Sequence, residues 1–107
     1  MVDKHLLEKK SLTQDEVQHK LREMELLEWR LCENEKGVPY IERVKHATSF
    51  MEGIEFVRRV AEKAEHNNHH PDIIINYKRI AVRFWTHSTS GITLADLQMA
   101  RKTDPLF

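Results

Sequence analysis

The segment 48–66 constrains the fold most strongly, because its apolar residues recur at the spacing of an α-helix. This spacing predicts a single apolar stripe made of Phe50, Ile54, Val57, Ala61 and Ala64. Gly53 lies within the helix and weakens it by about 1 kcal/mol relative to Ala, so we expect close contact with a neighbouring element there. Asn67 and Asn68 end the helix, and Pro71 prevents it from resuming.

Strand patterns occur in pairs on either side of this helix, over 29–32, 38–46, 73–76 and 79–87. A helix over 13–24 begins at a capping-box pair, Thr13 and Glu16. A final helix is capped by Thr93 and ended by Pro105. The order helix-strand-strand-helix-strand-strand-helix predicts an α+β fold, a four-stranded antiparallel sheet with three helices packed on one face.

The chain length of 107 residues suits one domain, so we treat 1–107 as a single domain whose polar residues 1–10 are expected to fray. Seventeen Lys and Arg balance seventeen Asp and Glu. This neutrality argues against a direct nucleic-acid partner. No apolar run is long enough to span a membrane, and the first residues lack the apolar stretch of a signal peptide. Cys32 is the only cysteine, which excludes an intrachain disulfide and favours the cytoplasm.

Histidines gather around the loop that follows the long helix. His66, His69 and His70 lie just before Pro71, and His87 ends the last expected strand. Imidazole is the side chain best suited to proton transfer near neutral pH. Two or three imidazoles around one cleft can donate and accept protons without a metal or a cofactor. Pro71 also restricts His70 to extended conformations, which favours a fixed pair.

Other interpretations of these residues stay open. A solvated polar loop also collects histidines. A metal site would need His69 and His70 on one side, whereas adjacent residues of an extended chain point to opposite sides. No cysteine or HExxH spacing supports a metal, so we expect none. Trp29 most simply packs in the core, and Trp85 shares a strand face with His87, where sheet packing or a subunit contact is the default.

Several short motifs follow one another along the second half of the chain, namely Glu65-x-x-x-His69-His70-Pro71, Tyr77, Thr86-His87, Gly91-Ile92-Thr93-x-x-Asp96 and Met99-Ala100. Upstream they are joined by Leu12-Thr13, Trp29, Phe50, Phe56 and Ala64-Glu65. This combination resembles the pterin-4a-carbinolamine dehydratase family. The resemblance extends over 12–100, which is most of the chain.

The resemblance implies a hydro-lyase, 4a-hydroxytetrahydrobiopterin dehydratase, that acts in tetrahydrobiopterin recycling. Such an enzyme removes water from 4a-hydroxytetrahydropterin to give quinonoid dihydropterin and needs no metal or cofactor. The family's three essential histidines match His69, His70 and His87. By the same resemblance, the acidic residue and the tryptophan of the pterin cleft match Glu65 and Trp29, and we expect Pro71, Thr86 and Trp85 to contact the substrate beside them. Acid and base remain unassigned among the three histidines.

Three departures from the family pattern keep a second hypothesis open. Trp85 replaces a small polar residue, Ala47 replaces an aromatic one, and Pro105 shortens the last helix. The family assembles into dimers or tetramers, so we expect a homodimer and leave the tetramer open. The alternative function is a non-catalytic dimerising or assembly module on the same fold. A pterin-related role outside the recycling of tetrahydropterin, for example in molybdopterin metabolism, is a third possibility.

Overall fold

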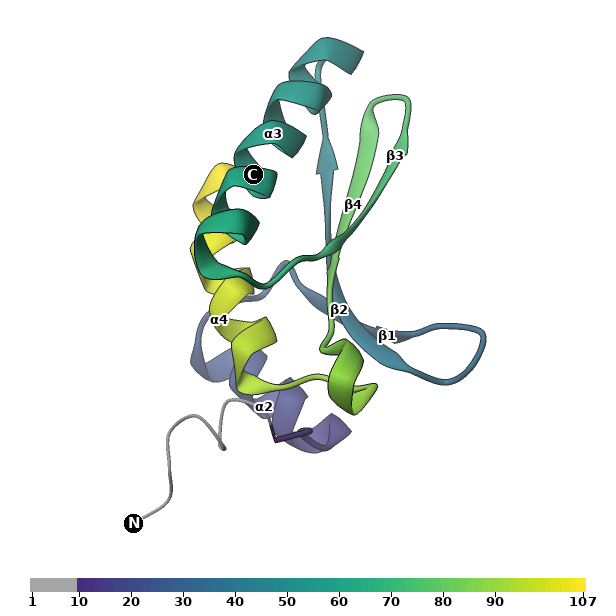
Figure 1. The fold of residues 1–107 in the computed structure, drawn as a ribbon, viewed down its shortest axis with the longest axis vertical. Helices are drawn as coiled ribbons and strands as arrows, with labels where there is room; N and C mark the ends of the chain where they lie inside the picture. The colour runs from purple at the N-terminus through teal and green to yellow at the C-terminus, as the bar shows by residue number, and fades with distance from the viewer. Residues whose placement is uncertain (1–9) are drawn as a thin grey trace.

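The computed structural model describes residues 10–107, which form one antiparallel sheet with α3 and α4 along one side (Figure 1). The elements are, in chain order, α2 (Gln14–Glu23), β1 (Arg30–Glu33), β2 (Pro39–His46), α3 (Phe50–Asn67), β3 (Asp72–Asn76), β4 (Arg79–Phe84) and α4 (Leu94–Thr103). Short 3-10 helices, His87–Thr89 and Asp104–Leu106, flank α4. The predicted α+β class and element order are confirmed. The expected fraying concerns mainly residues 1–9, which lie outside the described residues.

The sheet has the strand order β1-β2-β4-β3, so β2 and β4 are central and β3 is an edge strand. Cross-strand partners point to the same face of a sheet. Ile41 pairs with Phe84, and Ile73 pairs with Val82. Helices α3 and α4 both contact β4, and the helix-facing side chains of β4, including Ile80, are buried. Ile80, Val82 and Phe84, which alternate along this strand, are therefore its helix-facing residues.

Side-chain caps fix where two of the helices begin. The backbone N–H of Glu16 donates to Thr13 Oγ1 at 3.1 Å, and the Glu16 carboxylate accepts from the backbone N–H of Thr13 at 2.9 Å. The predicted capping box of α2 is therefore present. At α4 the same arrangement joins Thr93 and Asp96. Within residues 10–107, no helix combines the length and the apolar character that a membrane crossing requires.

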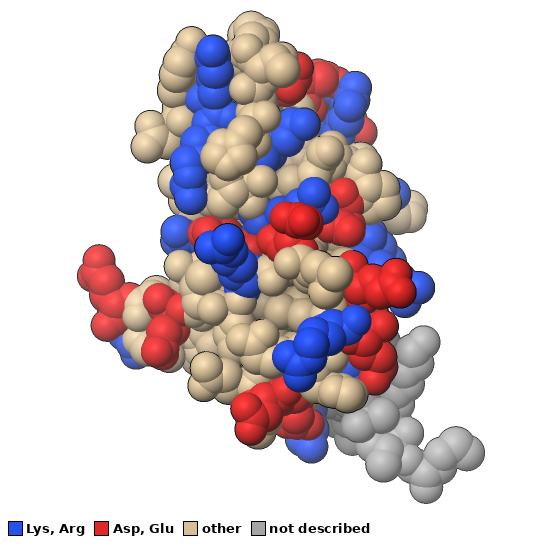
Figure 2. Space-filling view, turned by 180° about the vertical axis from the view of Figure 1, so that it is seen from behind, with Lys and Arg blue, Asp and Glu red and all other residues tan. Residues whose placement is uncertain are grey.

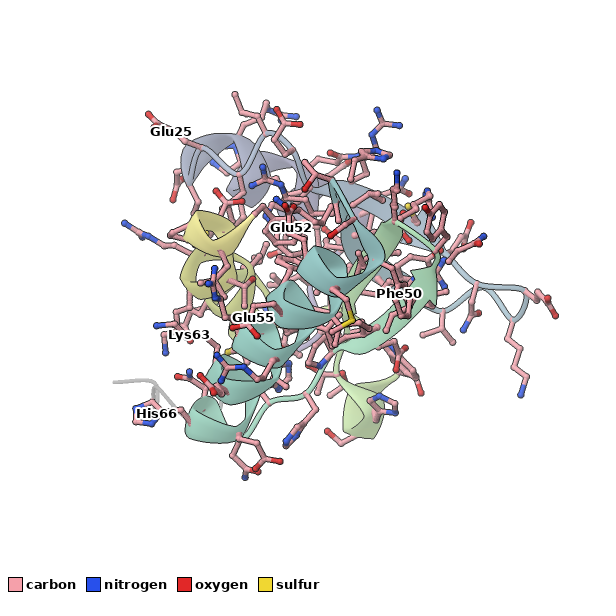
Figure 3. All side chains as sticks on the ribbon, turned by 90° about the horizontal axis from the view of Figure 1, so that it is seen from above. Glu25, Phe50, Glu52, Glu55, Lys63 and His66 are labelled. Carbon is pink, nitrogen blue, oxygen red and sulfur yellow. The ribbon has the colours of Figure 1, made fainter. Side chains whose placement is uncertain are left out.

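The buried side of α3 differs from the predicted stripe. The residues that the helix buries are Gly53, Phe56, Val60 and Ala64. Phe50 is 45% exposed and Ala61 is also exposed, so of the predicted stripe only Ala64 is fully buried, and Val57 packs against the core while partly exposed. Apolar residues occupy two adjacent sides of this helix, and spacing alone does not decide which side meets the sheet. Figure 3 shows Phe50 and Glu55 on different sides of the α3 ribbon.

Gly53 makes the close contact that its position predicts. A Cβ atom at Gly53 would lie 2.7 Å from Ile80 Cδ1 and 3.4 Å from the Cβ of Ala47. Both distances are shorter than, or at the limit of, ordinary carbon–carbon contact. The missing side chain of Gly53 therefore allows α3 to approach β4 closely.

The last strand is shorter than predicted, because β4 ends at Phe84 and not at His87. Its partner β3 begins at Asp72, directly after Pro71, which has no N–H to donate. Beyond β4, Thr86 forms an isolated bridge with Gly91 and so leaves the main sheet. His87 consequently lies in a short 3-10 helix.

Charges of both signs lie on the face of the molecule shown in Figure 2. Lys and Arg side chains are interspersed with Asp and Glu side chains there, and tan areas separate many of them. This distribution agrees with the formal net charge of zero.

Candidate active site

The β3–β4 pair brings the histidines of two distant segments to one end of the sheet. Asp72, the first residue of β3, pairs with Arg83 near the end of β4. The residues that precede β3 therefore lie beside those that follow β4. Continuing this register by two residues would set His70 opposite Trp85. Antiparallel pairing thus accounts for the proximity of His69 and His70 to the Thr86-His87 segment.

The turn between α3 and β3 has a defined shape. Asn68 ends α3 in the left-handed conformation with φ 49°, and its backbone N–H donates to carbonyl oxygens of the last helical turn. Asn adopts this conformation more readily than most residues. The backbone N–H of His69 then donates to the carbonyl of Ala64 at 3.1 Å. The position of His69 is therefore fixed by the helix end.

Asp96 lies at the centre of the hydrogen-bond network of the site and is fully buried. Its Oδ1 lies 2.6 Å from His69 Nε2. Its Oδ2 accepts from Thr86 Oγ1 at 2.7 Å and from the backbone N–H of Thr93 at 2.9 Å. A buried carboxylate is tolerated only when such partners replace water. Asp96 therefore joins the start of α4 to both segments of the site.

The Asp96 contact determines which nitrogen of the His69 ring carries a proton. An ionised carboxylate only accepts hydrogen bonds, so Nε2 of His69 carries a proton. A neutral His69 then has its free lone pair on Nδ1. The ring also lies nearly parallel to that of Phe84, with 6.2 Å between centroids and 13° between planes. His69 is thus held on two sides, while 20% of its side chain remains exposed.

His70 and Glu65 form a looser pair on the surface. His70 Nε2 lies 3.4 Å from Glu65 Oε1, and the two side chains are 54% and 80% exposed. The pair is ionic only while His70 is protonated. Exposed pairs of this kind contribute little to stability. Glu65 therefore orients His70 weakly, whereas Asp96 holds His69 firmly.

His87 is exposed and lies against Trp85. The centroids of the two rings are 3.8 Å apart, with 26° between the planes. Trp85 Nε1 donates to Asp72 Oδ2 at 2.7 Å. Thr86, between them in sequence, shares its hydroxyl with Asp96 and with Thr93 Oγ1 at 2.8 Å. The second segment of the site is therefore bonded both to β3 and to α4.

Trp29 lies in the core and not among these residues. It is 3% exposed, and its Nε1 donates to Asp104 Oδ1 at 2.9 Å. Its ring packs against Phe84 and Phe107 at centroid distances of 5.9 and 5.6 Å. The structure thus differs from the expectation of a tryptophan lining the cleft, because the last residues of the chain cover the indole. The core packing considered from sequence is the arrangement found.

Asp96 is the residue of the candidate site that spacing arguments missed. The pattern Thr93-x-x-Asp96 is fully explained as a capping box, so it gave no reason to look for a second partner of the carboxylate. Only the burial of Asp96 and its contact with His69 distinguish it from an ordinary cap. The one signal for Asp96 in the sequence is that this capping residue also belongs to the family motif Gly91-Ile92-Thr93-x-x-Asp96.

Two observations concern the surroundings of the site. Among residues 10–107, no group of three or more His, Cys, Asp and Glu side chains is arranged to hold a metal ion. A hollow of about 260 Å³ lies between α2 and the β1–β2 hairpin, and no histidine lines it. We place the candidate site at the histidines, because imidazole is the side chain best suited to proton transfer near neutral pH, whereas the titratable residues around the hollow are Cys32 and Glu33.

Comparison with known proteins identifies the family of the chain. A family model described as pterin 4 alpha carbinolamine dehydratase matches residues 10–106. A relative from Gloeobacter violaceus, provisionally named pterin-4-alpha-carbinolamine dehydratase 2, is 40% identical over 89 residues, which cover 83% of this chain and 94% of the relative.

Two solved structures are also similar. A Brucella melitensis protein described as a transcriptional coactivator/pterin dehydratase has a TM-score of 0.75 and 31% identity, covering 91% of this chain and 98% of its own. A pterin dehydratase-like protein, described as a RuBisCO assembly factor in the alpha-carboxysome, has a TM-score of 0.58 and 20% identity. The match covers 73% of this chain and 87% of that protein, and it shows similarity of fold alone. With a family model matched over nearly its whole length, this chain belongs to the pterin-4a-carbinolamine dehydratase family.

Proposed function

We propose that this protein is a dehydratase that converts 4a-hydroxytetrahydropterin to quinonoid dihydropterin and water by histidine acid–base catalysis. The observation that carries the proposal is the Asp96 network, which holds His69 and Thr86 beside the Trp85–His87 pair at one end of the sheet. Membership of the family supports the choice of a pterin as substrate. The proposed physiological setting is tetrahydrobiopterin recycling in the cytoplasm, where the free thiol of Cys32 would stay reduced.

The reaction needs one proton donor and one proton acceptor. The C–O bond at the saturated ring carbon breaks, and the departing hydroxide takes a proton and leaves as water. A ring N–H loses its proton, and its electron pair forms the new C=N bond. General acid–base assistance of this kind typically contributes 10²–10⁴-fold. A protonated imidazole and a neutral one on the same site meet both needs.

The three histidines differ in their contacts, and therefore in how well each can donate or accept a proton. His69 is fixed by Asp96, and in its neutral form it has an acceptor at Nδ1. His70 and His87 are more exposed and can exchange protons with water. We propose that all three act on the pterin, with Glu65, Pro71, Thr86 and Trp85 around it. Trp29 contributes by packing against Phe84, which is also the ring beside His69.

Dehydration of enzymatically generated 4a-hydroxytetrahydropterin tests the proposal directly. Wild-type protein should accelerate dehydration over buffer, and His70→Ala should lose most of that acceleration because a proton-transfer group is removed. His19→Ala is the matched control, since His19 is an exposed histidine paired with Glu23 on α2. If wild type matches buffer, or if His70→Ala matches wild type, the proposal is wrong.

A second candidate function is a non-catalytic dimerising or assembly module. It is favoured by the exposed apolar side chains of the described residues, which include Phe50, Met51, Ile74, Ile75 and Tyr77. The same fold occurs in a protein described as an assembly factor, and the Brucella melitensis protein is described as a coactivator as well as a dehydratase. Tagged protein is used to capture partners from a lysate of the source organism. A stoichiometric partner retained by the double variant His69→Ala, His70→Ala supports this function, and absence of any partner argues against it.

A further inference from the structure

Trp85 is an aromatic residue that lies against a histidine of the candidate site and outside the hydrophobic core. It follows β4 directly and is half-buried. The helix-facing residues of β4 supply the core beneath the site, whereas Trp85 stacks on His87 with 3.8 Å between centroids. A tryptophan that serves only packing would lie among apolar side chains, as Trp29 does.

The indole of Trp85 is itself anchored. Its Nε1–H donates to Asp72 Oδ2 at 2.7 Å, and Asp72 begins β3 directly after Pro71. Asp72 is paired across the strands with Arg83, which in turn is bonded to Glu42 on β2 at 2.6 Å. The anchor of the indole is therefore part of the sheet.

His87 has few other restraints among the described residues. Its side chain is exposed, and it begins a 3-10 helix of three residues. An exposed side chain populates several rotamers, and only some of them direct the imidazole toward a bound substrate. Parallel stacking at this short separation selects one ring orientation.

We propose that Trp85 is a positioning residue, which holds the imidazole of His87 in the orientation used for proton transfer through a stack anchored by Asp72. This assignment replaces direct pterin binding as the main role of Trp85, and it rests on the proposed dehydratase function. It predicts an effect on turnover, because the reacting group is misplaced when the indole is removed.

Kinetics of four variants, which are Trp85→Ala, Trp85→Phe, His87→Ala and the double variant, separate positioning from substrate contact. Trp85→Ala should lower kcat about 3- to 10-fold, the fold-change that corresponds to the energy of one aromatic stack, with KM nearly unchanged. Trp85→Phe, which can stack but cannot donate to Asp72, should have a kcat between those of Trp85→Ala and wild type, because the stack remains and its anchor is lost. In a His87→Ala background, Trp85→Ala should have no further effect, since the residue it positions is absent.

The imidazole resonances of His87 give a readout that does not depend on activity. A stacked indole shifts the ring C–H protons of His87 upfield in NMR spectra, and His87→Ala identifies these signals. Trp85→Ala should move them toward the position typical of His19, an exposed histidine that pairs with Glu23 on α2. Unchanged signals overturn the proposal, as does a raised KM with constant kcat or a full effect of Trp85→Ala in the His87→Ala background. If wild type lacks dehydratase activity, the proposed function fails, and the resonances alone decide whether Trp85 orients His87.

Discussion

At the scale of single residues, Asp96 has two roles that ordinarily belong to different residues. As the N3 residue of α4 it accepts from the backbone N–H of Thr93, and as a buried carboxylate it fixes the ring of His69. Its hydrogen bond from Thr86 ties in the other segment of the site. Stability of the fold and order in the site therefore depend on the same carboxylate.

Asp96→Ala should consequently damage both stability and activity. It removes a helix cap and leaves the Nε2 proton of His69 without its partner, so we expect a loss of about 3 kcal/mol in the free energy of unfolding. Urea denaturation measures this loss. The matched control is Asp15→Ala, since Asp15 is an exposed carboxylate in the first turn of α2 and caps nothing.

Asp96→Asn separates the two roles. The amide oxygen can still accept from one donor, but the second carboxylate oxygen becomes an NH₂ group, which cannot accept from Thr93 and Thr86. We expect partial recovery of stability relative to Asp96→Ala, with dehydratase activity still well below wild type. Asp96→Ala as stable as Asp15→Ala would show that the network contributes nothing to the fold.

At the scale of elements, the contact between α3 and β4 depends on the absence of a side chain at Gly53. Ala normally stabilises a helix interior by about 1 kcal/mol over Gly. Here the added methyl group would meet Ile80 Cδ1, and Ile80 is fully buried and cannot easily move away. Overpacking of a core typically costs 1–3 kcal/mol.

Gly53→Ala should therefore destabilise the wild-type protein, because overpacking outweighs the gain in helix propensity. In the Ile80→Val background, Gly53→Ala should instead raise the free energy of unfolding, since Ile80→Val removes the Cδ1 atom that the new methyl group meets. Thermal or urea unfolding of the two single variants and the double variant completes the cycle. Additive effects within about 0.5 kcal/mol would contradict the proposed contact.

The elements show what the sequence can and cannot determine. Capping residues such as Thr13 and the breaker Pro71 act locally, so the order of elements was predictable. The buried side of α3 depends on where β4 lies, and the apolar pattern fits a stripe through Phe50 as well as one through Phe56. The end of β4 depends on where its partner β3 begins. The residues 79–87 alone do not determine that position.

The same distinction holds for the site. The sequence proposes His69, His70 and His87 as candidates, because the family motif contains all three and the histidine-rich loop contains the first two. The resemblance alone placed Trp29 on the cleft, whereas contacts with Phe107 and Asp104 hold it in the core. Asp96 required the structure, because its contact with His69 spans elements that are distant in sequence.

At the scale of the whole molecule, β3 is the most exposed part of the sheet. It is an edge strand, and its sequence Asp72–Asn76 contains three consecutive isoleucines. Ile74 and Ile75 are 39% and 42% exposed. Soluble proteins usually protect such edges with Lys, Pro or a bulge. An unprotected apolar edge therefore favours pairing with a second copy of the chain.

We expect a homodimer in which the β3 strands of two copies pair, whereas the sequence and the fold leave the tetramer open. Light scattering after size-exclusion chromatography should give twice the monomer mass for wild type. Ile74→Lys should give the monomer mass, because antiparallel pairing centred near Ile74 would bring two ammonium groups together in a partly desolvated interface. Leu27→Lys is the matched control, since Leu27 is 73% exposed and lies between α2 and β1, outside the β3 edge. A monomeric wild type, or an Ile74→Lys variant that stays dimeric, would show that this edge is not the interface.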